Sequence, residues 1–302
     1  MQRNHVRSLL TRGEIILLDG ALGTELERRG VSTALPLWSA QALLDTPDMV
    51  RTIHEEYIRA GADVITAATF RTTPRALGKA GMHGEADRLT ERAVTLAREA
   101  RERAGGGREI WVAGSLAPLE DCYRPELAPS GDAAEEEHRV QAERLARCGA
   151  DLILIETMNT VAEARAAAAA ARTTGLPVLV SFICSGPRVI LSGEPLGDAA
   201  RAVEPYDPIA ILVNCVPAEI AAGCLDELSR ATPLPRGCYP NAGAPDMERG
   251  AWHFDAAMTP ERFAAMAGSW LERGAQVVGG CCGTGPDHIR ALRSALPPVL
   301  LE

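Results

Sequence analysis

A short motif recurs along the chain: a helical stretch ends at a glycine, and four to six apolar residues follow. Three examples begin at Gly61, Gly149 and Gly274, and a variant begins at Gly175. Glycine is favoured just after a helix because it adopts the left-handed backbone conformation without strain. The apolar residues suit strands that are buried on both faces, as in a parallel sheet. The pattern therefore predicts alternating helices and buried strands.

Eight apolar runs fit such strands, and helical segments separate them. The predicted strands are residues 15–18, 64–68, 110–114, 152–156, 178–183, 209–213, 237–240 and 276–279. The predicted helices are residues 40–59, 85–103, 133–147, 161–172, 196–203, 218–230, 260–272 and 286–295. Two helix starts carry capping signals, because Thr160 and Glu163 have the spacing of a capping box and Thr259 precedes Pro260.

Strict alternation of strands and helices predicts a closed (β/α)8 (TIM) barrel. An open doubly wound sheet is the rival fold, but no G-x-G-x-x-G turn follows the first predicted strand. No linker rich in Pro, Gly or Ser divides the chain, and α/β barrels commonly run to about 250 residues. We therefore expect residues 1–302 to form a single barrel domain.

Composition narrows the classes of function. The chain has 31 Lys and Arg against 40 Asp and Glu, a formal net charge of −9. This acidic balance argues against nucleic-acid binding, and no apolar stretch approaches the ~20 residues that span a bilayer. The N-terminus leads into no signal-peptide core, so we expect a cytoplasmic protein. Eight cysteines are too sparse for a disulfide scaffold and would stay reduced there.

The C-terminal ends of barrel strands are where chemistry is located in this fold. Polar residues or cysteines follow nearly every predicted strand: Asp19 and Gly20, then Thr69, Phe70 and Arg71, then Ser115, Glu156, Asn214 and Cys215, Asn241, and finally Cys281 and Cys282. Single polar residues end strands in any protein because loops are solvated. Three cysteines and two carboxylates at one barrel mouth go beyond that expectation and indicate a site.

The three cysteines Cys215, Cys281 and Cys282 suit Zn²⁺, because thiolates are preferred zinc ligands and a three-ligand site leaves a position for substrate. Adjacent cysteines can both ligate only where the backbone turns sharply, which the glycines around them permit. A structural zinc site would need a fourth Cys or His at short spacing. The alternatives are a vicinal disulfide or two ordinary buried cysteines.

Zinc that is open to substrate can bind a thiol and deprotonate it near neutral pH. The carboxylates Asp19 and Glu156, at the same mouth, would bind an ammonium group. Together these features fit an amino-thiol such as homocysteine. For Glu156 the alternative is a structural role, capping a neighbouring loop.

In these features the chain resembles the homocysteine S-methyltransferase family, and the resemblance extends over nearly its whole length. The motifs that carry the resemblance are Asp-Gly-Ala-Leu-Gly-Thr at 19–24, Leu37-Trp38-Ser39, residues 57–63, Thr69-Phe70, residues 114–118, Glu156-Thr157, Val213-Asn214-Cys215, residues 239–243 and Gly-Gly-Cys-Cys-Gly-Thr at 279–284. The last motif is highly specific in combination with Asn214-Cys215.

The resemblance implies a zinc barrel that transfers a methyl group to the sulfur of homocysteine and so forms methionine. It implies that Cys215, Cys281 and Cys282 are the zinc ligands and that the zinc they hold activates the substrate thiol. It also implies that Asp19, the Gly20 backbone and Glu156 hold the amino-acid end of homocysteine. We expect Thr69, Ser115 and Asn241 to contact the same substrate.

The sequence departs from the family where the methyl donor should bind. Ala67 and Ala68 stand where some relatives have Thr-Asn, and Arg71 follows Phe70 where betaine-using relatives have Tyr and S-methylmethionine-using relatives commonly have Gln. A quaternary ammonium donor favours an aromatic cage, and Arg71 would repel it. We therefore expect S-methylmethionine or S-adenosylmethionine, with Trp38, Phe70 and Arg71 on the donor side. Arg71 would bind the donor's carboxylate or a folate tail, and Trp38 has the alternative of a core role.

Two other functions stay open at this point. One is methyl transfer from a methylated corrinoid or folate that a partner protein carries, and the other is a non-catalytic zinc or redox sensor on the same barrel. The amino-acid clamp of Asp19 and Glu156 favours an enzyme with small-molecule substrates. No dimerisation arm follows the eighth predicted strand, so we expect a monomer or a compact homodimer.

Overall fold

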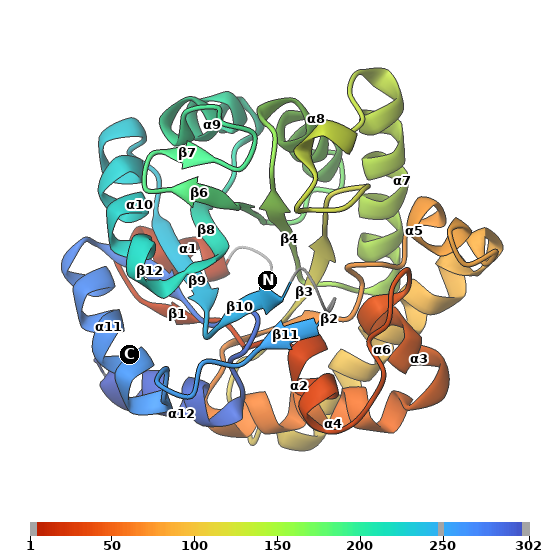
Figure 1. The fold of residues 1–302 in the computed structure, drawn as a ribbon, viewed down its shortest axis with the longest axis horizontal. Coiled ribbons are helices and arrows are strands. Elements are labelled where there is room, and N and C mark those ends of the chain that lie inside the picture. The colour runs from red at the N-terminus through yellow and green to blue at the C-terminus, as the bar shows by residue number, and fades with distance from the viewer. Residues whose placement is uncertain (1–4, 247–250, 298–302) are drawn as a thin grey trace.

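The structure, a computed structural model, describes residues 5–246 and 251–297 and has a closed parallel barrel at its centre (Figure 1). The barrel strands are β1 (Ile16–Leu17), β2 (Val64–Ala67), β3 (Trp111–Leu116), β4 (Leu152–Met158), β5 (Val178–Phe182), β8 (Ala210–Pro217), β9 (Arg236–Asn241) and β12 (Ala275–Val278). β1 pairs with β12, and a bridge from Leu18 to Val64 closes the ring. The predicted TIM-like barrel is confirmed.

The surrounding helices follow the prediction closely. They are α4 (Pro47–Ala60), α6 (Ala86–Ala104), α7 (Asp132–Cys148), α8 (Val161–Arg172), α9 (Leu196–Val203), α10 (Ala218–Ala231), α11 (Pro260–Glu272) and α12 (Pro286–Ala295). The prediction of one helix over 40–59 is wrong, because α3 (Gln41–Asp45) ends before α4 begins. Thr46 has a φ of −139°, outside the helical region, because it precedes Pro47 and a residue before proline disfavours the helical conformation.

The glycines of the recurring motif adopt the predicted left-handed conformation. Their φ values are 112° at Gly61, 93° at Gly149, 69° at Gly175 and 76° at Gly274. Gly61 and Gly149 directly follow α4 and α7, and Gly274 follows α11 after one residue. Gly175 lies in the turn beyond the end of α8, so all four turn the chain toward the next strand.

Several shorter elements were not predicted from the sequence. They are α1 (His5–Thr11), α2 (Gly23–Arg28), α5 (Pro74–Gly78), and the hairpins β6 (Cys184–Gly186) with β7 (Val189–Ile190) and β10 (Ala244–Asp246) with β11 (Ala251–His253). Val6 and Leu10 of α1 pack against the first residues of the barrel strands, including Trp111 and Ile209. This helix closes the N-terminal end of the barrel and leaves the opposite end for a ligand.

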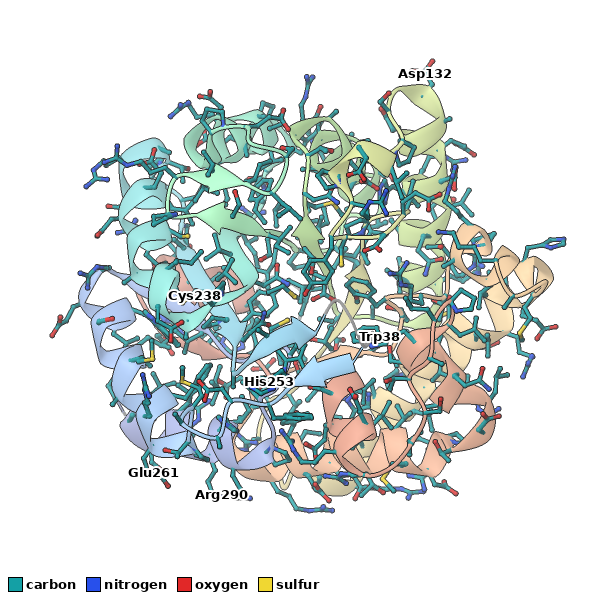
Figure 2. The ribbon with its side chains drawn as sticks, viewed as in Figure 1. Trp38, Asp132, Cys238, His253, Glu261 and Arg290 are labelled. Carbon is teal, nitrogen blue, oxygen red and sulfur yellow. The ribbon has the colours of Figure 1, made fainter. Side chains whose placement is uncertain are left out.

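Charged side chains cover the outside of the helical ring. Figure 2 shows Asp132, Glu261 and Arg290 at its outer edge, whereas Trp38 lies nearer the middle, at the barrel mouth. Among the described residues, no helix combines the length and apolar character needed to cross a membrane. The outer surface is thus polar, and the mouth is where aromatic side chains meet open space.

One buried side chain in the helical layer makes the stability of the fold depend on pH. His54 in α4 is 1% exposed, and neither ring nitrogen has a hydrogen-bond partner among the described residues. Burial lowers its pKa from 6.5 to about 4, because the charged imidazolium would lose its hydration. Between these two values the unfolded chain binds more protons than the folded one, so stability falls as pH falls through this window.

We expect wild-type protein to lose about 2 kcal/mol of unfolding free energy through His54 between neutral pH and about pH 5. The variant His54→Leu should lack this part of the acid sensitivity, which urea midpoints at the two pH values would measure. His83 is exposed, so His83→Gln serves as the control and should behave like wild type. An equal loss in His54→Leu and wild type would contradict the assignment.

Candidate active site

A cavity of about 410 Å³ opens at the C-terminal ends of the barrel strands. Most of the site residues predicted from the sequence line it: Asp19, Gly20, Trp38, Phe70, Arg71, Ser115, Glu156, Cys215, Cys281 and Cys282. Thr69 and Asn241 are buried but are not part of the lining. The Thr69 hydroxyl instead donates to the Ser115 carbonyl at 2.9 Å and so ties the end of β2 to β3.

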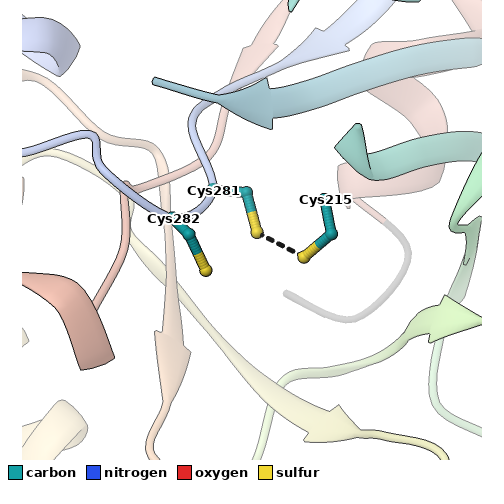
Figure 3. Close-up of side chains that lie close together, drawn as sticks. All are labelled: Cys215, Cys281 and Cys282. Atoms are coloured by element: carbon teal, nitrogen blue, oxygen red, sulfur yellow. Dashed lines mark hydrogen bonds between the residues drawn. The ribbon is translucent and has the colours of Figure 1, made fainter. Parts of the chain in front are cut away.

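The three cysteines at the mouth come from two separate strands. Cys215 lies near the end of β8, and Cys281 and Cys282 follow β12, with β9 between the two strands. Figure 3 shows the three side chains converging, with Cys215 Sγ 2.8 Å from Cys281 Sγ. All three sulfur atoms lie within 4.8 Å of one another as free thiols, so they could hold one metal ion.

The loop after β12 is folded back onto β9 by two backbone hydrogen bonds. The Cys281 amide donates to the Pro240 carbonyl, and the Ala242 amide donates to the Cys282 carbonyl, both at 2.8 Å. Gly283 follows with a φ of 84°, and a Cβ on it would lie 1.8 Å from the Ala242 carbonyl oxygen. Only glycine fits there, so the predicted need for glycine around the adjacent cysteines is met at this position.

Asn214 supports Cys215 from behind. Its side-chain amide donates to the Thr157 hydroxyl at 2.8 Å and to Cys215 Sγ at 3.5 Å. Its carbonyl oxygen accepts from the Thr157 amide at 2.9 Å and from the Ser181 hydroxyl at 2.7 Å. Asn214 is fully buried, so this one side chain joins the ends of β4, β5 and β8 around the thiol.

The cysteine cluster favours one thiolate. Hydrogen bonds from the Cys215 and Cys282 thiols hold the pKa of Cys281 well below its ordinary range, although burial opposes this. A hydrogen bond that an S–H group donates to a thiolate stabilises the charged form of that thiolate. Cys281 is therefore the sulfur of the three on which negative charge is most stable.

Two carboxylates, the buried Asp19 and the half-buried Glu156, lie at the same mouth. Asp19 accepts hydrogen bonds from the Thr66 amide at 2.7 Å and the Thr66 hydroxyl at 3.0 Å, and Glu156 accepts from the Ser115 hydroxyl. Burial nevertheless raises the pKa of Asp19 to about 7 and that of Glu156 to about 8. Neither carboxylate has a cationic partner among the described residues, so the pair is suited to a cation supplied by a ligand.

Part of the cavity wall is aromatic. The Trp38 and Phe70 rings meet edge to face with centroids 5.5 Å apart, and the Arg71 guanidinium lies 5.6 Å from the centre of the Phe70 ring. Gly23 packs beneath Trp38, where a Cβ would lie 2.2 Å from the indole ring. Trp38 thus faces the cavity and is not a core residue.

Further lining residues were missed by the sequence analysis. They are chiefly Asp121, Cys122 and Tyr123 in the loop between β3 and α7, Tyr239 in β9 and Trp252 in β11. The available signal was the position of the loop, since every loop after a barrel strand faces the mouth. Glu163 holds this loop, because its carboxylate accepts from the Leu119 amide at 2.8 Å and lies 3.2 Å from His138 Nε2. The Thr160 side chain caps α8 as predicted, by accepting from the Glu163 amide. The Glu163 carboxylate binds the Leu119 amide and does not complete the predicted capping box.

Comparisons with known proteins cover almost the whole chain. The profile of the family described as homocysteine S-methyltransferase matches residues 16–296. A homocysteine S-methyltransferase of Escherichia coli strain K12 is 34% identical over 97% of this chain and 99% of its own. The homocysteine S-methyltransferase YbgG of Bacillus subtilis is 32% identical over 96% of each chain. A selenocysteine methyltransferase of Astragalus bisulcatus is 31% identical over 94% of this chain and 93% of its own.

A solved structure agrees with these relatives. The metallated form of the homocysteine methyltransferase MmuM from Escherichia coli superposes with a TM-score of 0.83 at 32% identity, covering 96% of this chain and 99% of that one. The barrel, the position of the cysteine cluster and the length of the match therefore point to one conclusion. This chain belongs to the homocysteine S-methyltransferase family and is an enzyme of methyl transfer to homocysteine.

Proposed function

We propose that the chain binds Zn²⁺ through Cys215, Cys281 and Cys282 and transfers a methyl group from a sulfonium donor to homocysteine, forming methionine. The observation that carries the proposal is the set of three sulfur atoms within 4.8 Å at the wall of a cavity that the carboxylates of Asp19 and Glu156 also line. Three thiolates match the ligand preference of zinc. The Escherichia coli relative, solved in a metallated form, adds support for a metal.

The acceptor end of the site is the part with Asp19 and Glu156. An ammonium group between these carboxylates would favour their ionised forms and lower both raised pKa values. The Ser115 hydroxyl and the backbone at Gly20 complete this side of the cavity. An amino acid held there would direct its side-chain sulfur toward the cysteine cluster, as the proposed acceptor requires.

When bound, zinc would lower the pKa of the acceptor thiol so that it is present as a thiolate near neutral pH. The sulfur then attacks the donor methyl carbon in line, a new S–CH₃ bond forms, and the old one breaks. The bonding pair of the broken bond stays on the donor sulfur, which leaves as a neutral thioether. The protein's part is to align the two sulfur atoms and exclude water from between them.

The donor side is the wall with Trp38 and Phe70. A sulfonium is a soft cation, and the face of an aromatic ring attracts such a charge. S-methylmethionine and S-adenosylmethionine both carry a sulfonium methyl and both leave as neutral thioethers. Two aromatic rings do not make a rich cage for a quaternary ammonium group, so betaine is the donor we least expect.

The direct test is to incubate zinc-loaded protein with homocysteine and a panel of methyl donors, and to assay methionine by mass spectrometry. Product with S-methylmethionine or S-adenosylmethionine would support the proposal and identify the donor. No product with any small donor, despite one bound zinc, would overturn it in favour of a methyl-corrinoid or methyl-folate partner protein or of a zinc-sensing role.

We expect Cys281→Ala to lose both bound zinc and methyl transfer, because two thiols form an incomplete zinc site. Metal analysis and the methionine assay measure the two losses, and circular dichroism would confirm that the barrel is intact. Cys148→Ala, in a half-buried helical position away from the mouth, is the matched control and should keep both properties. Normal turnover by metal-free Cys281→Ala would sink the mechanism.

We expect Glu156→Ala to keep one zinc per chain but to raise the KM for homocysteine by roughly 10- to 100-fold, the usual worth of a charge-assisted hydrogen bond. The substitution removes the carboxylate that would contact the substrate ammonium group, whereas the three cysteine ligands stay in place. Steady-state kinetics with homocysteine varied would measure this effect. An unchanged KM would show that Glu156 has the structural role instead.

A further inference from the structure

Arg71 is a buried cation without an anionic partner. It is 9% exposed, and its Nη1 donates to the Glu120 carbonyl at the long distance of 3.5 Å. Its buried Nε has no hydrogen-bond partner among the described residues. The neighbouring Glu120 carboxylate is not available, because Arg75 at 3.0 Å and Lys79 at 2.5 Å already bind it.

A guanidinium that is buried and unpaired is unfavourable unless an anion meets it. Arg71 is part of the wall of the cavity at the barrel mouth, so an anion bound in this cavity would meet its guanidinium. Arginine favours carboxylates in particular, because its planar fork matches both oxygens.

A second charge of opposite sign lines the same region. Asp121 lies in the loop after β3, and the Tyr123 amide donates to its Oδ1 at 2.9 Å and so fixes the carboxylate. Asp121 forms no ion pair within the described part of the chain, and in particular none with Arg71. Burial raises the pKa of the neighbouring Cys122 thiol to about 12, while Arg71 lowers this pKa and Asp121 raises it, so both charges lie near this sulfur in the cavity wall.

This pair is separate from the carboxylates proposed to bind homocysteine. Arg71 stacks beside Phe70, which in turn meets Trp38, so the pair belongs to the aromatic wall. Asp19 and Glu156 accept hydrogen bonds from Thr66 and Ser115, within β2 and β3, whereas Arg71 and Asp121 lie in the loops that follow these two strands. The cavity therefore has charged groups in its loops as well as at its strand ends, and those in the loops are left for the second substrate.

We propose that Arg71 and Asp121 form a subsite for the α-amino-acid head of the methyl donor, with Arg71 binding its carboxylate and Asp121 its ammonium group. The two unpaired charges of opposite sign match a zwitterion, which a folate tail or a simple sulfonium does not provide. The inference rests on the proposed function in taking the donor to be a second amino acid. It makes Arg71 and Asp121 specificity-determining residues.

Binding without turnover tests the subsite independently of methyl transfer. S-methylmethionine titrated into zinc-loaded protein in a calorimeter, with homocysteine absent, should bind wild type roughly 10- to 100-fold more tightly than Arg71→Met or Asp121→Asn. The exposed pair Arg139 and Glu136 in α7 lies outside the cavity lining, so Arg139→Gln and Glu136→Gln are the matched controls and should bind like wild type. Equal binding by Arg71→Met and wild type, or no binding by wild type, would overturn the subsite.

A second experiment removes the carboxylate of the ligand, whereas the first removes a charge of the protein. Wild type should lose roughly 10- to 100-fold in kcat/KM when S-methylmethionine is replaced by its decarboxylated analogue, whereas Arg71→Met should lose little further. A 5-methyltetrahydrofolate titration covers the other carboxylate source, and Arg71-dependent binding of that ligand alone would refute the amino-acid assignment.

The two failures can be told apart. Arg71-dependent binding of S-methylmethionine without methionine production would refute the proposed function and leave the subsite standing. Methionine production with an unchanged donor KM in Arg71→Met would refute the subsite and leave the proposed function standing.

Discussion

The proposed chemistry depends on bringing sulfur atoms from two non-adjacent strands within 4.8 Å of one another. β9 lies between β8 and β12, so the cysteines meet only because the loop after β12 folds back over the end of β9. Strand register is therefore part of the site. A slip of one residue in β8 would turn Cys215 to the other face of the barrel wall and separate it from the other two thiols.

Much of the fold could be predicted because the barrel strands are buried on both faces and appear as apolar runs between helical segments. Residues 161–172 and 260–272 were bounded correctly, since a threonine cap or a proline marks their starts. The break at Thr46 carries a proline signal, but helical sequence continues on both sides of it. The hairpins β6–β7 and β10–β11 have strands of two or three residues, too short for any periodicity to be detected.

The site was predictable where it lies at strand ends, because a parallel barrel gathers those ends at one mouth. Thr69 and Asn241 also follow strands but do not line the cavity, and the direction of a side chain just after a strand depends on local turns that sequence does not specify. Asp121 and Tyr123 lie in a long loop without periodicity, so nothing in their local sequence set them apart. Their place depends on Glu163, a distant residue that holds the loop.

Three residues at the mouth adopt a backbone conformation that side chains disfavour. Trp38 has a φ of 48°, Thr157 a φ of 60° and Cys215 a φ of 52°, and each such residue costs on the order of 1 kcal/mol. Replacing Thr157 with glycine would relieve this strain but also remove the hydroxyl that Asn214 holds beside Cys215. Selection for heat resistance alone would thus favour changes that loosen the sulfur cluster, so thermostability and activity oppose each other at this position.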